Sequence, residues 1–102
     1  MRQYETLLLL SPELNSDDRK GILDNLTGIL SREDGSLLVA DEWGMRDLAY
    51  AVRKQTRGYY IRLEYAAAGD TVTELERNIR ITDGVLKFMT VKLADTFVPQ
   101  EA

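Results

Sequence analysis

The fold of this 102-residue chain follows from one segment, Gly58-Tyr59-Tyr60-Ile61-Arg62-Leu63-Glu64-Tyr65-Ala66. Its odd-numbered positions are apolar or aromatic, and charged side chains stand between them. A period of two is typical of a β-strand with one buried and one open face. Tyr59 and Tyr65 are therefore expected in or near the core. Tyr60 and Arg62 fall on the opposite face, where we expect them to be exposed.

Three further strands are predicted around this one. Residues 3–10 begin with alternation and end in four leucines, and residues 36–43 and 85–93 also have strand character. Glycine inside such a pattern is typical of a bulge or bend, which we expect at Gly44. Residues 45–57 continue the second strand as an arm of mixed character.

Two amphipathic helices separate the strands. The first places apolar side chains on one helical face, namely Ile22, Leu26, Ile29 and Leu30. Ser16 is its expected N-terminal cap, and Gly35 is expected to end it in a left-handed conformation. The small Gly21 and Gly28 are expected to let this helix lie close to the sheet. The second helix is predicted to begin at Thr71-Val72-Thr73-Glu74, which fits a capping box.

The resulting order βαββαβ predicts an α+β protein with a ferredoxin-like fold. Right-handed crossovers would place both helices on one face of a four-stranded antiparallel sheet. The other face is then open to solvent or to a partner. We expect one domain over residues 1–93 and a short C-terminal tail over residues 94–102. The tail contains Phe97-Val98-Pro99 and is predicted to be disordered without its partner.

Composition argues against an enzyme. The chain has no Cys and no His, which excludes thiolate chemistry and removes the usual general base and the commonest metal ligand. Its paired carboxylates fall at helix ends and strand edges, and no glycine-rich loop fits a phosphate cradle. We therefore expect no catalytic residue, no metal and no cofactor. The longest apolar run, Leu7 to Leu10, is too short to span a bilayer, so we expect a soluble, cytoplasmic protein.

The distribution of charge points to a binding protein. The net charge is −4, yet residues 43–92 carry nine basic and six acidic side chains. Basic and aromatic groups together favour a nucleic-acid or protein interface. Arg57-Gly58-Tyr59 begins like the strand signature of an RNA-recognition motif, but Tyr60 and Ile61 depart from it, so we do not predict base stacking on the sheet. A ligand-sensing regulatory domain that forms homodimers is the alternative, and an acyl-phosphate hydrolase is disfavoured because the first loop lacks a cation.

Three segments of the chain carry a resemblance to a known family. They are Met1-Arg2-Gln3-Tyr4-Glu5; Gly44-Met45-Arg46-Asp47-Leu48-Ala49-Tyr50 followed by Lys54 and Gly58-Tyr59-Tyr60; and Arg80-Ile81-Thr82-Asp83-Gly84-Val85-Leu86-Lys87-Phe88-Met89-Thr90-Val91-Lys92. In order and spacing the chain resembles the bacterial small-subunit ribosomal protein S six family from Met1 to about Lys92. The resemblance implies a non-enzymatic protein that binds the central domain of small-subunit (16S) rRNA as a heterodimer with ribosomal protein S eighteen.

The resemblance also implies which residues take part. On the rRNA side these are Arg2, Arg80, Lys87 and Lys92. On the partner-protein side they are Trp43, Met45, Arg46, Leu48, Tyr50, Arg53 and Lys54. Because the first and last strands are neighbours in this fold, we expect Arg2, Lys87 and Lys92 to gather along one edge. Trp43 is expected either as an exposed anchor or as packing under the arm. Asp47 is expected to reduce the positive potential of the adjacent Arg46.

Overall fold

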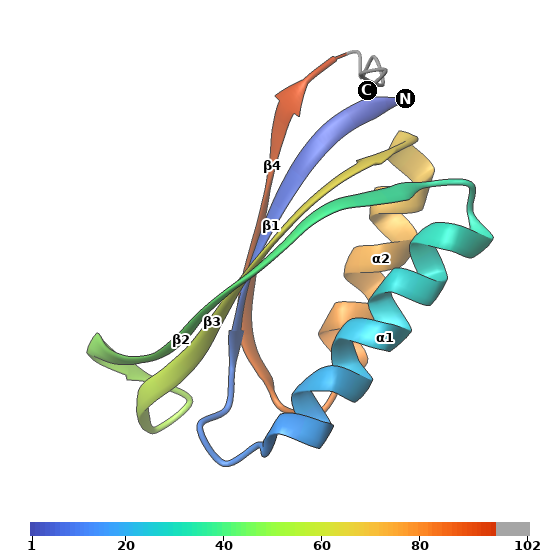
Figure 1. The fold of residues 1–102 in the computed structure, drawn as a ribbon. Helices are drawn as coiled ribbons and strands as arrows, with labels where there is room; N and C mark the ends of the chain where they lie inside the picture. The colour runs from blue at the N-terminus through green and yellow to red at the C-terminus, as the bar shows by residue number, and fades with distance from the viewer. Residues whose placement is uncertain (96–102) are drawn as a thin grey trace.

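The computed structural model describes residues 1–95 and has the predicted order of elements. These are β1 (Arg2–Leu10), α1 (Ser16–Arg32), β2 (Ser36–Val52), β3 (Gln55–Ala67), α2 (Gly69–Ile81) and β4 (Val85–Ala94). The sheet has the order β2-β3-β1-β4 with antiparallel pairing throughout, and both helices cover one face (Figure 1). The ferredoxin-like fold is confirmed.

Among the described residues, no helix is long and apolar enough to cross a membrane. The predicted extended segment Phe97-Val98-Pro99 lies outside the described residues.

The core lies between the sheet and the two helices. The sheet contributes alternate side chains of β1 and β3, and the helices contribute one face each; the fully buried members include Leu8, Leu10, Ile61, Leu63, Leu26, Leu30, Leu75 and Ile79. Tyr65 is in this core, as predicted, and Tyr59 is partly buried against it. A polar cluster lies within the same layer. Thr6 Oγ1 is 2.8 Å from the Tyr65 hydroxyl and 2.9 Å from Thr90 Oγ1.

Helix α1 begins one residue away from the predicted cap. Asn15, not Ser16, is the N-cap: its side chain accepts a hydrogen bond from the Asp18 backbone N–H at 2.8 Å, and Asp18 accepts one in return. At the other end, Asp34 takes the left-handed conformation (φ 62°) that we expected at Gly35. The short polar side chain of asparagine can cap a helix, and that of aspartate allows the left-handed conformation, because both form local hydrogen bonds with the backbone.

The glycines of α1 do not bring the helix to the sheet. Gly21 and Gly28 are exposed, and a Cβ added at either would meet nothing within 4 Å. The close approach is at Gly35 instead, where an added Cβ would lie 3.0 Å from the Ala66 carbonyl oxygen. The expectation for Gly21 and Gly28 is therefore wrong, because both lie on the solvent side of the helix.

Helix α2 does not use the predicted capping box. It begins at Gly69, with Ala68 as N-cap and no side-chain cap. Thr71 is buried inside the first turn, and Glu74 instead accepts hydrogen bonds from Arg77 and Asn78. The predicted capping box is therefore wrong: Thr71 lies inside the helix and is buried, so it does not take the N-cap position.

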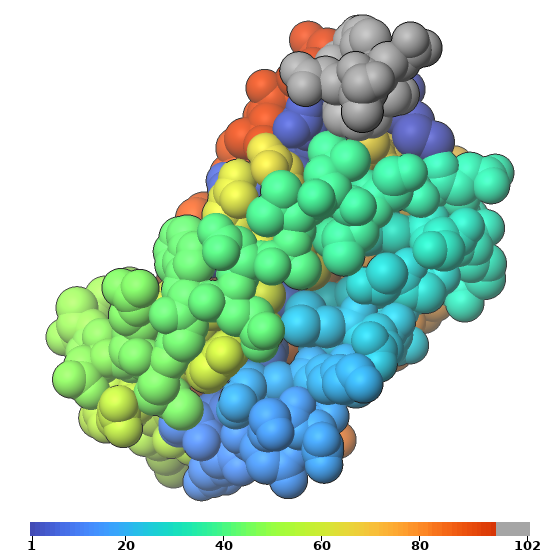
Figure 2. Space-filling view, in the orientation of Figure 1, coloured from blue at the N-terminus to red at the C-terminus, as the bar shows by residue number. Residues whose placement is uncertain are grey.

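Strands β2 and β3 form one long hairpin. The arm predicted over residues 45–57 is the continuation of this ladder. The register shifts at Gly44, which has φ 91°, so the predicted bulge is confirmed. The two strands are joined by Arg53 and Lys54, which have φ 47° and 68°. The hairpin tip lies on the side of the molecule away from the two helices, and its surface is continuous with the rest of the protein (Figures 1 and 2).

Candidate RNA- and protein-binding surface

The helix-free face of the sheet carries an apolar patch, which comprises Leu7, Leu9, Leu48, Tyr50, Tyr60 and Met89. Leu7, Leu9, Tyr60 and Met89 point away from the core because their neighbours in sequence point into it, and Leu48 and Tyr50 of β2 line a hollow together with Leu9 and Tyr60. Two shallow hollows, of about 210 and 250 Å³, share Leu9, Tyr60 and Lys87 in their walls. Tyr50 is 70% exposed and Met89 58% exposed. Leu7, Leu48 and Tyr60 are partly buried, and Leu9 is buried at the wall of both hollows. Apolar side chains that gather on an uncovered sheet face are typical of an interaction surface.

Trp43 extends the apolar patch along β2. Its ring centroid lies 6.3 Å from that of Tyr60, and its Nε1 donates to Asp41 at 3.4 Å. The side chain remains 42% exposed. Trp43 was expected either to pack or to be an exposed anchor. It packs on the sheet and is also exposed enough for a partner to contact it.

Arg62 is not the exposed cation that the alternation predicted. It is partly buried and forms ion pairs with Glu5 and, at 3.4 Å, with Glu64. The hydrogen bond to Glu5 raises the pKa of the Arg62 guanidinium. Tyr60 is also only partly exposed. The positive charge of Arg62 is therefore balanced within the sheet, a pairing across strands that alternation along one strand does not reveal.

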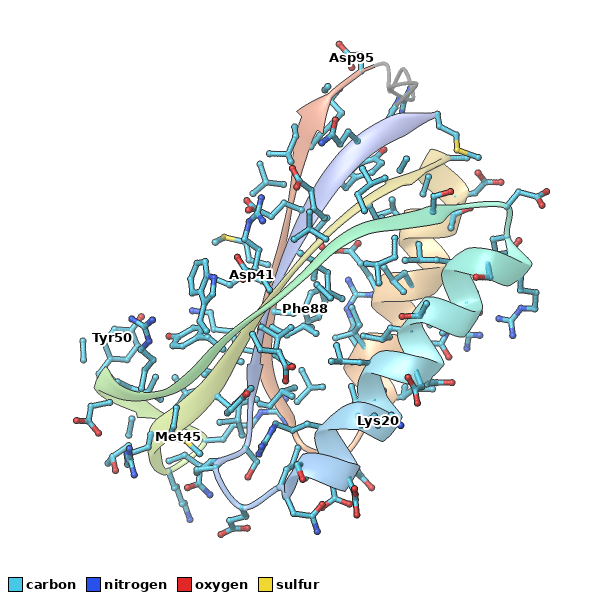
Figure 3. The ribbon with its side chains drawn as sticks, in the orientation of Figure 1. Lys20, Asp41, Met45, Tyr50, Phe88 and Asp95 are labelled. Atoms are coloured by element: carbon cyan, nitrogen blue, oxygen red, sulfur yellow. The ribbon has the colours of Figure 1, made fainter. Side chains whose placement is uncertain are left out.

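The rRNA-side candidates lie at opposite ends of the sheet. In the β1–β4 register, Lys87 is opposite Leu9 and Lys92 is opposite Tyr4. The two lysines are five positions apart in one strand, and an odd spacing makes their side chains point to opposite faces of the sheet. The expectation that Arg2, Lys87 and Lys92 gather along one edge is therefore wrong. Figure 3 shows the distance between the two ends, with Asp95 at one and Tyr50 in the hairpin at the other.

Acidic groups surround the cations at the Arg2 end. Lys92 Nζ lies 2.5 Å from the Asp95 carboxylate, and this hydrogen bond lowers the pKa of Asp95. Arg2 lines a hollow of about 440 Å³ together with Asp70 and Asp95. Two acidic side chains therefore accompany Arg2 and Lys92 at this end.

The other end is basic. Arg80 and Lys87 line a hollow of about 380 Å³, and Arg53 of the hairpin tip joins them. The Arg80 guanidinium carbon lies 5.5 Å from the centre of the Phe88 ring, within range of a cation–π interaction. We had placed Arg53 on the partner-protein side only. Sequence reasoning missed its position because the contact joins segments about 30 residues apart.

The remaining arm residues are spread over both faces of the hairpin. Met45 is opposite Tyr59 and partly buried, whereas Arg46 is opposite Gly58 and exposed. Asp47 pairs with Arg57 across the hairpin at 3.0 Å. The expected effect of Asp47 on Arg46 is therefore reduced, because its carboxylate already has a partner. Over residues 1–95, no group of three or more His, Cys, Asp or Glu side chains is placed to hold a metal ion.

The chain is similar to known proteins in both sequence and structure. The chain matches the family model described as "Ribosomal protein S6" over residues 3–92. The small ribosomal subunit protein bS6 of Nitratidesulfovibrio vulgaris (strain DP4) is 67% identical, over 93% of this chain and 94% of that protein. The protein of the same name from Solidesulfovibrio magneticus is 59% identical over the full length of both. A solved structure of 30S ribosomal protein S6 from Thermotoga maritima shares the fold, with a TM-score of 0.83 and 24% identity over 89% of this chain and 86% of that one.

The fold is a ferredoxin-like sheet with one helix-covered face and one uncovered face. The chain belongs to the ribosomal protein S6 family of the small ribosomal subunit, which is not a family of enzymes. The matches to the family model and to the relatives confirm the predicted family. The similarity to the solved structure confirms the fold independently.

Proposed function

We propose that this chain binds the central domain of 16S rRNA together with ribosomal protein S eighteen, and that it positions RNA during assembly of the small subunit in the cytoplasm. One observation carries the proposal: the uncovered apolar patch and the basic hollow share a wall at Lys87. A protein partner on the patch would therefore lie directly beside RNA phosphates at the hollow. Phosphate contacts hold RNA in place without reading its sequence, which suits a protein that positions RNA.

The net charge of −4 supports a shared interface. Long-range attraction to RNA needs positive potential, which a small basic partner would supply. The partner would contact the arm through Trp43, Met45, Arg46, Leu48, Tyr50, Arg53 and Lys54, as the family resemblance implies. Aromatic and arginine side chains contribute most of the binding free energy in such interfaces. The rRNA would contact Arg2, Arg80, Lys87 and Lys92.

A gel-shift titration tests this proposal. The chain is titrated onto a central-domain fragment of 16S rRNA at two salt concentrations, with and without protein S eighteen. We expect RNA binding when the partner is present. Binding should be weaker at the higher salt concentration, because the release of counterions from the phosphates then favours it less. A chain that binds neither the partner nor the RNA would contradict the proposal and would favour the ligand-sensing alternative.

A matched pair of variants tests the role of the apolar patch. Tyr50→Ser removes a 70% exposed aromatic from the patch, and Ile81→Ser removes a 69% exposed apolar side chain from the end of α2. We expect only Tyr50→Ser to weaken the heterodimer, by about tenfold, as is typical of an aromatic residue central to an interface. Equal effects of the two variants would show that the patch is not the partner site.

A further inference from the structure

The basic hollow is built from three elements of the chain, and Arg53 is separated from the other two cations by more than 25 positions. Arg53 comes from the β2–β3 turn, Arg80 from the last turn of α2, and Lys87 from the start of β4. Apolar residues complete its wall, and none of the acidic residues among 1–95 lines it. Three cations around about 380 Å³ thus create a local positive potential on an acidic protein.

The cations of the basic hollow have no acidic partners. Arg57, Arg62, Arg77 and Lys92 each form an ion pair, whereas Arg53, Arg80 and Lys87 form none within residues 1–95. The Phe88 ring lies beside the Arg80 guanidinium and leaves its N–H donors free. A guanidinium held in this way is suited to bidentate binding of a phosphate group.

The turn that presents Arg53 is conformationally unfavourable. Two-residue hairpin turns with positive φ at both positions favour Asn-Gly, because other residues are strained there. Arg53 and Lys54 have φ 47° and 68°, a region that residues with a Cβ seldom adopt because it is strained. Strain of this kind concentrates at binding and catalytic sites, and here it places a cation over the hollow.

We propose that the basic hollow binds a phosphodiester group of the RNA backbone. Because Arg53 lines this hollow with Arg80 and Lys87, the proposal moves Arg53 from the partner-protein side, where the family resemblance puts it, to the RNA side of the complex. This inference rests on the proposed function and specifies its main phosphate site. The Arg2 end of the sheet differs from the basic hollow because its cations have acidic neighbours. Lys92 is paired there with Asp95, and Arg2 shares its hollow with Asp70 and Asp95. RNA contacts should therefore depend more on Arg53, Arg80 and Lys87 than on Arg2 and Lys92.

The test uses single neutral variants of the full chain. Arg53→Gln, Arg80→Gln and Lys87→Gln are compared with Arg32→Gln and Lys20→Gln, which remove exposed cations of α1. Affinity for the central-domain fragment is measured with protein S eighteen over a range of salt. We expect each hollow variant to bind about tenfold more weakly, as for the loss of a charged hydrogen bond. Each should also lower the slope of log affinity against log salt by about 0.7–0.9.

Heterodimer formation without RNA distinguishes the two assignments of Arg53. We expect Arg53→Gln to bind protein S eighteen as tightly as the unmodified chain. A loss of partner binding with an unchanged salt slope would overturn the inference and return Arg53 to the partner side. If hollow and control variants bind RNA equally while the unmodified chain binds well, the inference fails but the proposed function stands. If the unmodified chain does not bind RNA with its partner, the proposed function itself fails.

A spectroscopic titration separates RNA from free phosphate. The Nε–Hε signals of Arg53 and Arg80 in the heterodimer with protein S eighteen are followed by NMR while the RNA fragment or inorganic phosphate is added at matched ionic strength. We expect the signals to shift with RNA at micromolar concentration and with inorganic phosphate only at much higher concentration. Equal responses to the two would indicate a site for free phosphate and would overturn the assignment to the RNA backbone.

Discussion

Replacing Thr6 by valine should destabilise the fold through the polar cluster in its core. Thr6 is fully buried, and its hydroxyl contacts the Tyr65 hydroxyl at 2.8 Å and the Thr90 hydroxyl at 2.9 Å. Valine has nearly the same shape but makes neither hydrogen bond. Each buried hydrogen bond contributes about 0.5–1.5 kcal/mol net, and an orphaned buried hydroxyl costs about 1–3 kcal/mol. We expect the free energy of unfolding to fall by about 2–3 kcal/mol.

The companion variant Tyr65→Phe should cost less, about 1 kcal/mol, because Thr6 keeps its hydrogen bond to Thr90. In the double variant the Tyr65 hydroxyl is no longer orphaned. The double variant should therefore lose about 1 kcal/mol less of the free energy of unfolding than the sum of the losses in the two single variants. Thr73→Val serves as control, since its exposed hydroxyl makes only a 3.3 Å bond to the Gly69 carbonyl.

Urea unfolding, followed by circular dichroism, measures these differences, and thermal unfolding checks them. For a domain of this size, about 2 kcal/mol corresponds to a fall in Tm of about 8–16 °C. The reasoning is refuted if Thr6→Val is within 0.5 kcal/mol of the unmodified chain, or if the costs of Thr6→Val and Tyr65→Phe are additive.

Three further predictions concern local structure. Asn15→Ala should lower the free energy of unfolding by about 1 kcal/mol, because the Asp18 backbone N–H loses its acceptor; no change in urea unfolding would contradict the capping box. Lys54→Gly should raise it by about 1 kcal/mol by relieving the positive φ of 68°, and a loss of stability would show that the turn is not strained. The hydrogen bond from Arg77 lowers the pKa of Glu74, so this carboxylate stabilises the fold at neutral pH and the contribution is lost as pH falls through the lowered pKa. NMR titration should give a pKa below 4.5 for Glu74 and a higher one in Arg77→Gln; an unchanged pKa would exclude Arg77 as the cause.

The strands and the core were predictable because they depend on periodicity. Tyr65 and Ile61 in β3, and Leu26 and Ile29 in α1, occupy the buried positions that spacing assigned to them. The start of α2 was not predictable from a motif. Thr71 has a capping residue's chemistry, yet its burial against the core outweighs that local preference.

The candidate site was predictable in part. The arm was predicted to follow the second strand, and its pairing with β3 is observed, whereas its role in binding stays a prediction. The tip was not recognised as a two-residue turn because Arg53-Lys54 lacks the Asn-Gly signature. The pairing of Arg62 with Glu5, and of Lys92 with Asp95, decides which cations are free. The first of these pairings joins residues 57 positions apart, and no pattern along the chain encodes it.

The position of β1 has a consequence for synthesis of the chain. This strand is made first, yet it lies in the middle of the sheet and pairs only with β3 and β4. Leu10 has Tyr59 as its partner in β3, so about 50 residues must be added before that pair can form. At about 5–20 residues per second, the segment Leu7–Leu10 waits roughly 2–10 s as an unpaired apolar strand. Until β3 emerges, this strand is the segment of the nascent chain most exposed to misassociation and to capture by chaperones.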